Sequence, residues 1–237
     1  MQKMTDICFQ PVGVIQSCFK QKFAIPRQPG LVPQACATIK LSKVYAATEI
    51  VRGLENYSHI WVIFVFHKSR MSKNKNTVRP PRLGGDKRMG VFATRSNYRP
   101  NPIGQSVVKL EGVKNENHQT FIYVSGGDFL DGSPVLDIKP YIPYVDAIPS
   151  ATAGFAAQAP EKQFCVTMSS AVRAQIRQAE NSTGVDVLRL VENLLAYDPR
   201  PRHVQPDSIL VTRIFDYDLK WQINNNVVSV LSLEPAS

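Results

Sequence analysis

The fold of this chain is decided by the stretch Tyr57-Ser58-His59-Ile60-Trp61-Val62-Ile63-Phe64-Val65-Phe66-His67-Lys68. Residues 60–66 at its centre are continuously apolar, and several are β-branched or aromatic, which predicts a strand. The run is far shorter than the roughly 20 apolar residues of a membrane-spanning helix. The predicted strand delivers His67 and Lys68 to its end, where functional sites are commonly built. We interpret His59 as structural, because a single histidine is more often a satisfied structural residue than a catalyst.

Similar short runs lie on both sides of this strand. They cover residues 12–19, 35–44, 106–110 and 120–124. The last two are predicted to form a hairpin closed at residues 115–118. No glycine motif of the form GxGxxG follows any of these runs and no helix of the required length separates them, which argues against a doubly wound nucleotide-binding sheet. We therefore predict a mainly β fold, a sheet or barrel, for residues 1–150.

The composition changes after this part of the chain. Residues 147–159 are mostly small and predict a linker. Two helices are predicted next, the first starting near Ser169 and the second stopped by Pro199. Their apolar stripes are Val172, Gln175, Ile176 and Ala179 in the first, and Val187, Leu190, Val191 and Leu194 in the second. With predicted strands at residues 209–215, 219–223 and 227–233, residues 160–237 are expected to form a small α+β unit.

The charge of the chain is unevenly distributed. The formal net charge is +9, and residues 68–88 hold eight cations against Asp86 alone. With prolines and glycines among them, these residues predict a solvated, mobile loop whose field attracts a polyanion such as RNA. The alternative is a loop that serves only solubility.

The cysteines and the N-terminal residues indicate the cellular compartment. Cys8, Cys18, Cys36 and Cys165 form no CxxC pair, and no histidine lies near them at zinc-ligand spacing. Residues 1–10 lack the pattern of a signal peptide. We expect a reduced, cytoplasmic protein without a structural metal and without membrane association.

Two further segments combine turn residues with charge. In residues 90–104 two prolines stiffen the backbone around Asn101, and Arg95 and Arg99 offer planar guanidinium groups suited to carboxylate or phosphate. Residues 128–141 interleave the carboxylates of Asp128, Asp131 and Asp137 with turn residues. Aspartates in turns commonly bond their own backbone, but Asp137 lies on an apparent strand and needs partners such as ribose hydroxyls.

Together the segments at residues 57–61, 90–104 and 130–141 resemble the TsaA-like family, and within it the TrmO-type tRNA (adenine-N6)-methyltransferases. The resemblance covers about residues 8–145, and Tyr197-Asp198-Pro199-Arg200-Pro201 resembles a signature of the C-terminal domain that longer members carry. It implies a single-sheeted β-barrel, a homodimer, and methyl transfer from S-adenosyl-L-methionine to N6 of threonylcarbamoyladenosine beside the anticodon.

Carried over by position, the resemblance implies a set of donor-binding residues: Pro26, Arg27, Gln28, His67, Lys68, Arg95, Gln105, Val135, Leu136, Asp137 and Ile138. Gln105 stands where an apolar residue is expected, and Asn97-Tyr98 replaces the usual pair before Arg99.

The chemistry assigns further roles as hypotheses. Methyl transfer is an in-line displacement that depends on alignment, and a base near N6 would help, for which Asp128 and Asp131 are candidates. Arg95 or Arg27 could hold the donor carboxylate, and Arg99 or an arginine of the basic loop the threonyl carboxylate. The predicted RNA contacts are Arg79, Arg82, Lys87, Arg88, Arg99, Tyr197, Arg200 and Arg202.

Two other functions fit the same residues. One is a non-enzymatic RNA-binding barrel, whose RNA affinity would be indifferent to S-adenosyl-L-methionine. The other is a methyltransferase acting on a protein or small molecule, for which the basic loop would be incidental. Steeply salt-dependent tRNA binding would favour a nucleic-acid substrate.

Overall fold

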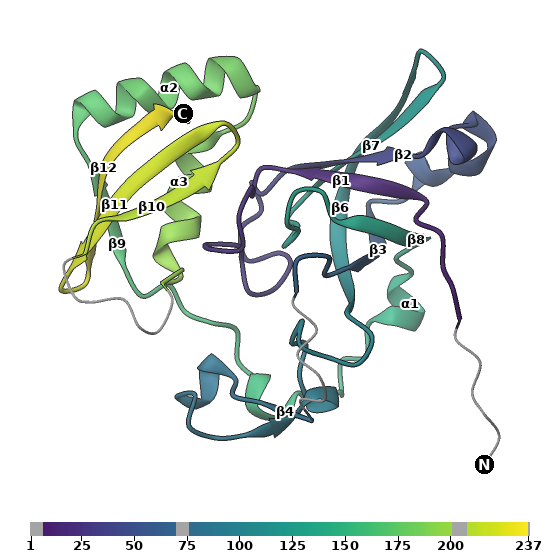
Figure 1. The fold of residues 1–237 in the computed structure, drawn as a ribbon, viewed down its shortest axis with the longest axis horizontal. Coiled ribbons are helices and arrows are strands. Elements are labelled where there is room, and N and C mark those ends of the chain that lie inside the picture. The colour runs from purple at the N-terminus through teal and green to yellow at the C-terminus, as the bar shows by residue number, and fades with distance from the viewer. Residues whose placement is uncertain (1–6, 70–75, 201–207, 237) are drawn as a thin grey trace.

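The computed structural model describes residues 7–69, 76–200 and 208–236. It contains a closed six-stranded barrel with the strand order β1-β2-β7-β6-β3-β8, followed by a four-stranded sheet with the order β10-β11-β12-β9 (Figure 1). The predicted mainly β fold, with a barrel first and a small α+β unit after it, is confirmed.

The barrel strands follow the predicted runs closely. They are β1 (Gly13–Ser17), β2 (Ala37–Leu41), β3 (His59–Val65), β6 (Ile103–Glu116), β7 (Gln119–Ser125) and β8 (Pro134–Pro140). Burial alternates along β3, so that Ile60, Val62 and Phe64 point inward, as expected of a strand with one face on a core. Ile15 and Ile39 are fully buried in the same core.

The predicted hairpin is confirmed as β6 and β7. Its ladder ends at the pair Glu116 and Gln119, and the two turn residues, Asn117 and His118, have φ angles of 51° and 59°. A two-residue turn with both φ angles positive matches the twist of the strands that it joins. Gly104 near the start of β6 allows close packing, because a Cβ there would lie 2.4 Å from Cζ of Phe64.

Short elements connect the barrel strands and lead from β8 to the C-terminal unit. They are the 3-10 helices η1 (Lys43–Tyr45), η2 (Thr48–Val51), η3 (Leu54–Asn56), η4 (Pro81–Leu83), η5 (Val91–Ala93) and η6 (Gly154–Ala156), the helix α1 (Pro143–Asp146), and the paired strands β4 (Thr77–Val78) and β5 (Met89–Gly90). Strand β4 lies within residues 68–88, the segment predicted as a mobile loop, and pairs with β5 directly after that segment, so that the described part of the loop takes part in a small two-stranded sheet.

The C-terminal unit consists of β9 (Cys165–Met168), α2 (Ser170–Thr183), α3 (Val187–Ala196), β10 (Leu210–Ile214), β11 (Tyr217–Asn224) and β12 (Val227–Pro235). Ser169 caps α2 as predicted, since its hydroxyl accepts a hydrogen bond from the Val172 amide. The predicted stripes of both helices are buried, except that Gln175 is partly exposed. Strand β9 has no counterpart among the predicted elements. It is short, and it exists through parallel pairing with β12.

The molecule has two hydrophobic cores. The first fills the barrel. The second lies between α2, α3 and the four-stranded sheet, and it also takes in Phe19, Ala24, Val32 and Ala35. Residues 19–35, which connect β1 to β2, therefore pack with the C-terminal unit although the chain places them before most of the barrel (Figure 1).

The four cysteines are free, and Cys18 is buried, Cys36 partly buried, and Cys8 and Cys165 exposed. No helix within the described ranges combines the length and the apolar character that crossing a membrane requires. Among the described residues, no three histidine, cysteine, aspartate or glutamate side chains gather where they could hold a metal ion.

Candidate functional site

A large cleft opens where the barrel, the β4–β5 segment, the linker after α1 and the end of α3 meet. Its volume is about 2460 Å³, which exceeds the roughly 300–1,000 Å³ of a typical small-molecule pocket. Its walls are apolar at Phe64, Phe66 and Leu31 and cationic at the arginines described below. The cleft can therefore hold a small molecule together with part of a second, anionic partner.

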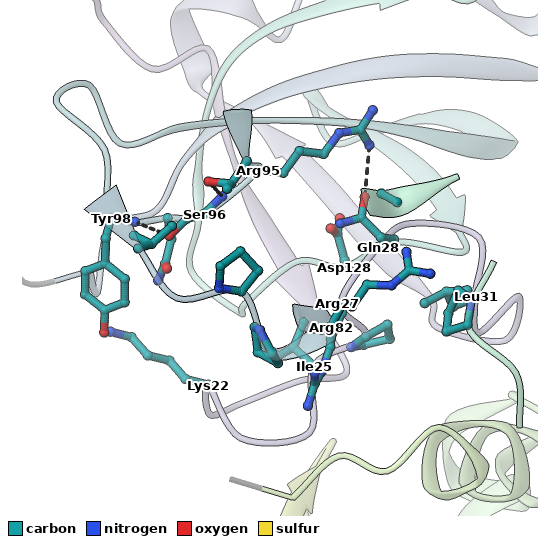
Figure 2. A pocket seen from close by; sticks show the side chains of 18 of the residues that line it. Lys22, Ile25, Arg27, Gln28, Leu31, Arg82, Arg95, Ser96, Tyr98 and Asp128 are labelled. Carbon is teal, nitrogen blue, oxygen red and sulfur yellow. Dashed lines mark hydrogen bonds between the residues drawn. The ribbon is translucent and has the colours of Figure 1, made fainter. Parts of the chain in front are cut away.

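Six of the predicted donor-binding residues line this cleft, from three segments that are far apart in the chain. They are Pro26, Arg27, Gln28, His67, Lys68 and Arg95. A hydrogen bond joins two of these segments, because Nη1 of Arg95 donates to Oε1 of Gln28 over 3.0 Å (Figure 2). This contact leaves the other guanidinium nitrogens of Arg95 available for a ligand carboxylate.

The pair at the end of β3 is held by its surroundings. The His67 Nδ1 atom lies 3.3 Å from the Ser133 hydroxyl, and Lys22 donates to the Lys68 carbonyl. Burial lowers the pKa of His67, and the positive charges of Lys68 and Lys22 lower it further. His67 is therefore a neutral ring at pH 7, which can accept or donate a hydrogen bond without adding charge.

Asp128 also lines the cleft. Its Oδ1 accepts a hydrogen bond of 2.6 Å from the buried Ser106 hydroxyl. Burial is the largest cause of the raised pKa of Asp128, and the Ser106 hydrogen bond and the Arg95 charge act in the opposite direction. A raised pKa makes a carboxylate a stronger base.

Asp131 has a different environment. Its Oδ1 accepts from the Ser17 amide over 2.8 Å, and its Oδ2 lies 3.2 Å from the Lys20 ammonium. Asp131 does not belong to the cleft lining, so the two aspartates that the sequence could not distinguish are separated by the fold. Ser106 was not among the predicted site residues. The sequence feature that could have identified it is a polar side chain at an inward position of a strand with alternating burial.

The remaining predicted donor residues lie on or inside the barrel wall. In the sheet Ile63 lies between Gln105 of β6 and Asp137 of β8. Gln105 is exposed, and Asp137 forms an ion pair of 2.8 Å with Lys139. Val135 is buried and Ile138 packs against the barrel core, whereas Leu136 occupies an irregularity of the β3–β8 ladder. These residues are outside the cleft lining of the single chain.

Some of the predicted RNA contacts line the cleft and others do not. Arg79, Arg82, Arg88, Tyr197 and Arg200 line the cleft, and Lys87 is exposed outside its lining. Arg99 donates from Nη1 to the Thr94 carbonyl over 3.1 Å and thereby holds the loop that carries Arg95. Arg202 lies outside the described residues.

The Tyr197–Arg200 turn presents its arginine in a fixed orientation. Asp198, with a φ of 50°, binds the Arg200 guanidinium through both of its oxygens, at 2.8 and 3.0 Å. The guanidinium carbon lies 5.3 Å from the centroid of the Phe164 ring. The hydrogen bonds to Asp198 raise the pKa of Arg200, so it stays charged at the edge of the cleft.

Comparison with known proteins covers both parts of the chain. A family model described as the tRNA-methyltransferase O N-terminal domain matches residues 14–147, and one described as the TrmO C-terminal domain matches residues 161–236. The chain is 40% identical to the tRNA (adenine(37)-N6)-methyltransferase of Escherichia coli over 98% of this chain and 100% of the relative.

A second relative and a solved structure agree with this. A Pseudomonas aeruginosa protein described as a putative S-adenosylmethionine-dependent methyltransferase is 46% identical, with 89% of this chain and 90% of the relative covered. The crystal structure of TrmO from Pseudomonas aeruginosa is similar with a TM-score of 0.83 and 38% identity, covering 100% of both chains.

Proposed function

This chain belongs to the TrmO family, and from that membership we propose that it methylates N6 of an adenine in tRNA with S-adenosyl-L-methionine as the methyl donor. The observation that carries the proposal for this chain is the cleft, in which three distant segments place Gln28, His67 and Arg95 in one lining with the partly buried carboxyl group of Asp128.

The chemistry of the cleft fits the donor. The donor has a carboxylate, an adenine ring and a sulfonium group that supplies an electrophilic methyl group. Arg95, oriented by Gln28, and Arg27 are suited to the carboxylate. Apolar walls such as Leu31 and Phe66 are suited to a flat ring. These residues bind and orient, which is the main contribution available to an in-line displacement.

Asp128 is proposed as the base. When N6 attacks the methyl carbon, the carbon–sulfur bond breaks, and N6 must lose a proton. The raised pKa of Asp128 suits its carboxylate to accept that proton. Ser106 holds the carboxylate in one orientation through Oδ1. We retain Asp128 rather than Asp131, because both oxygens of Asp131 are engaged away from the cleft.

We propose threonylcarbamoyladenosine next to the anticodon as the acceptor. An arginine can bind its threonyl carboxylate through two parallel hydrogen bonds. Arg82 and Arg88 of the basic segment line the cleft, and Arg82 also donates to the Gln158 carbonyl, whereas Arg99 lies outside the cleft lining and donates to a backbone carbonyl of its own loop. We therefore favour the basic segment over Arg99 for this contact.

The remaining cations are proposed to position the tRNA. Arg79 lies on the same cleft wall, and Arg200 and Tyr197 lie at the end of α3. Cationic groups bind phosphate and the aromatic ring can stack on an unpaired base. A tRNA substrate supports a cytoplasmic location for the chain.

We further propose a homodimer formed through the outer wall of β3 and β6. This wall exposes an apolar strip that includes Trp61, Ile63, Ile103 and Val107, all of them at least partly accessible. A second copy that covers the strip would bring residues next to Gln105 and Asp137, which the single chain leaves apart from its cleft. A shared site would account for predicted donor residues on two faces of one barrel.

The test is transfer of tritium from labelled S-adenosyl-L-methionine to total tRNA from cells that lack this gene, followed by nucleoside analysis. Label in methylated threonylcarbamoyladenosine would confirm donor, acceptor and reaction together. Label in a methylated adenosine that lacks the threonylcarbamoyl group would overturn the proposed acceptor and leave the proposed donor and reaction standing. Donor binding without label in intact modified tRNA would favour a protein or small-molecule substrate, and tRNA binding that ignores the donor would favour a non-enzymatic module.

A further inference from the structure

The segment that carries Pro26, Arg27 and Gln28 is built as part of the C-terminal unit. Residues 19–35, here called the donor segment, contain no helix or strand. Phe19 and Val32 are 1% and 2% exposed, and they belong to the buried cluster that contains Leu190, Leu194 and Trp221. The barrel core contains no residue of this segment.

Backbone and ring contacts attach the start of the donor segment to the C-terminal sheet. Phe19 forms a β-bridge with Ile214, and the Phe215 amide donates to the Cys18 carbonyl over 2.7 Å. The Phe23 ring stacks on Trp221 with 6.1 Å between centroids and 13° between planes. The start of the segment thus continues the edge of the C-terminal sheet.

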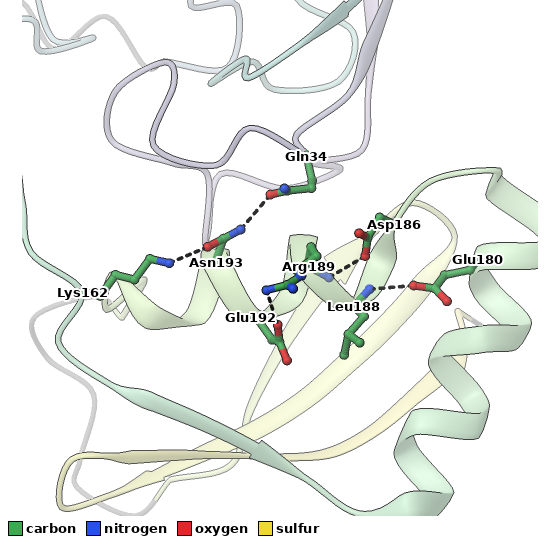
Figure 3. A network of polar contacts seen from close by, with 8 residues as sticks. All are labelled: Gln34, Lys162, Glu180, Asp186, Leu188, Arg189, Glu192 and Asn193. Atoms are coloured by element: carbon green, nitrogen blue, oxygen red, sulfur yellow. Dashed lines mark hydrogen bonds and ion pairs between the residues drawn. The ribbon is translucent and has the colours of Figure 1, made fainter.

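A polar contact attaches the other end to helix α3. Nδ2 of Asn193 donates to Oε1 of Gln34 over 2.8 Å, and Oδ1 of Asn193 accepts from the Lys162 ammonium, also over 2.8 Å (Figure 3). Because an ammonium group can only donate, it fixes the Asn193 amide with its oxygen toward Lys162 and its NH₂ toward Gln34. The sequence separation of Gln34 and Asn193 is 159 residues.

Between these attachments the donor segment faces the cleft. Pro26, Arg27 and Gln28 line it, and Gln28 orients Arg95. The barrel and its loops contribute hydrogen bonds. The Gly126 carbonyl accepts from the Gly30 amide over 2.8 Å, the Asp131 amide donates to the Phe19 carbonyl over 2.9 Å, and the Gly127 amide donates to the Ala35 carbonyl over 3.3 Å. A segment without regular structure holds one conformation only when outside contacts offset its lost entropy, and the buried apolar contacts of this segment come from the C-terminal unit.

We propose that the C-terminal unit positions the donor-binding residues of the cleft, with Asn193 and Gln34 as positioning residues. The inference rests on the proposed function, since it takes Pro26 to Gln28 as donor contacts. Neither positioning residue lines the cleft, so each acts through the donor segment rather than by touching the donor. The C-terminal unit, which is expected to contact tRNA, would then also determine the affinity for the methyl donor.

The experiment measures the Kd of the full-length chain for S-adenosyl-L-methionine without tRNA, by equilibrium dialysis of the labelled donor. Asn193→Ala and Gln34→Ala are each expected to weaken donor binding about fivefold, the effect of one partly buried neutral hydrogen bond. The double variant should be no weaker than either single variant, because both remove the same bond. The KM for tRNA should stay within about twofold in all three.

Two controls separate positioning from general destabilisation. Arg189→Ala removes an exposed side chain one turn earlier on α3, where its partner is Glu192 of the same helix, and it should leave the donor Kd unchanged. The exchange Gln34→Asn with Asn193→Gln keeps the combined side-chain length and should restore most of the affinity. Thermal unfolding shows whether each variant is folded at the assay temperature.

The outcomes are distinguishable from failure of the proposed function. A wild-type chain that binds no donor would overturn the proposed function and this inference with it. A wild-type chain that binds donor, with folded Asn193→Ala and Gln34→Ala variants that bind it as Arg189→Ala does, would overturn the positioning role alone. Additive losses in the double variant would also contradict it, because the two residues would then act separately.

Discussion

The cleft and the outer wall of the barrel take their side chains from opposite faces of the same strands. Inward and end positions of β3 lead to the cleft through Phe64, Phe66 and His67, whereas its outward positions present Trp61 and Ile63 on the outer wall. The cleft collects cations and the partly buried carboxyl group of Asp128, while the strip on the wall is apolar with Gln105 and Asp137 beside Ile63. One face is thus suited to charged small molecules and RNA, and the other to a second protein surface.

This difference explains why the predicted donor residues divide into two groups. A strand places successive side chains on opposite faces, so a motif read along β8 must supply residues to both the core and the wall. Val135 and Asp137, two residues apart, would share a face in a regular strand, but the ladder irregularity at Leu136 shifts the alternation, so that Val135 points into the barrel core and Asp137 lies on the wall. If the cleft alone binds the donor, the wall residues are irrelevant to affinity; if a dimer shares the site, both groups matter.

The largest effect is expected from Asp128→Asn, which removes the proposed base from the cleft. Turnover should fall by about 10² to 10⁴, the usual contribution of a general base, with the donor Kd nearly unchanged. In the wild type, kcat should rise with pH as Asp128 loses its proton, at a pH above the ordinary range of aspartate because its pKa is raised. Single-turnover rates across pH check both points.

Stability provides the control for this variant. Because the folded-state pKa of Asp128 lies above its unfolded value, the unfolded chain ionises first, and folding stability falls as pH rises above the unfolded pKa. The neutral side chain of the Asp128→Asn variant avoids that loss and can still accept from Ser106. The thermal midpoint of the variant at neutral pH should therefore equal or exceed that of the wild type, and a large decrease would mean that lost activity reflects misfolding.

Ile63→Lys tests the outer wall. Burying an ammonium in an apolar interface is costly, and the neighbouring Asp137 carboxylate already pairs with Lys139, so the dimer dissociation constant should rise by about a hundredfold or more, as measured by sedimentation. Val14→Lys is the matched control, since Val14 is an outward, 43% exposed residue of β1. A monomeric wild type, or equal dissociation in the two variants, would contradict a dimer formed through this wall.

Arg95→Ala tests which arginine of the cleft binds the donor carboxylate. Loss of a hydrogen bond to a charged group should raise the donor Kd about ten- to a hundredfold, measured by calorimetry. Arg27→Ala is the comparison, because both arginines line the cleft and only Arg95 is oriented by Gln28. A larger loss in Arg27→Ala would transfer the carboxylate contact to Arg27.

The smallest expected change is the salt dependence of tRNA binding in Arg82→Ala. If Arg82 contacts a phosphate, the slope of log K against log salt should decrease by about one. If it recognises the threonyl carboxylate instead, the discrimination between modified and unmodified tRNA should fall while the slope changes little. Filter binding at several salt concentrations distinguishes the two roles.

Much of this molecule was determined by local sequence. The β-branched and aromatic content of residues 60–66 and 120–124 favours strands, and the apolar stripe at Val187, Leu190 and Leu194 predicts a helix with one face to be covered. The basic composition of residues 76–88 likewise predicts exposed cations, and Arg79, Arg82, Lys87 and Arg88 are exposed.

Other features depended on contacts between distant residues. Nothing local distinguishes Asp128 from Asp131, yet one lies against Ser106 in the cleft and the other against Lys20. Strand β9 pairs with β12, and the donor segment stacks Phe23 on Trp221 and accepts a hydrogen bond from Asn193 at Gln34. The physical reason is that burial and hydrogen-bond partners set the chemistry of a side chain, and a chain supplies those partners only after it has folded.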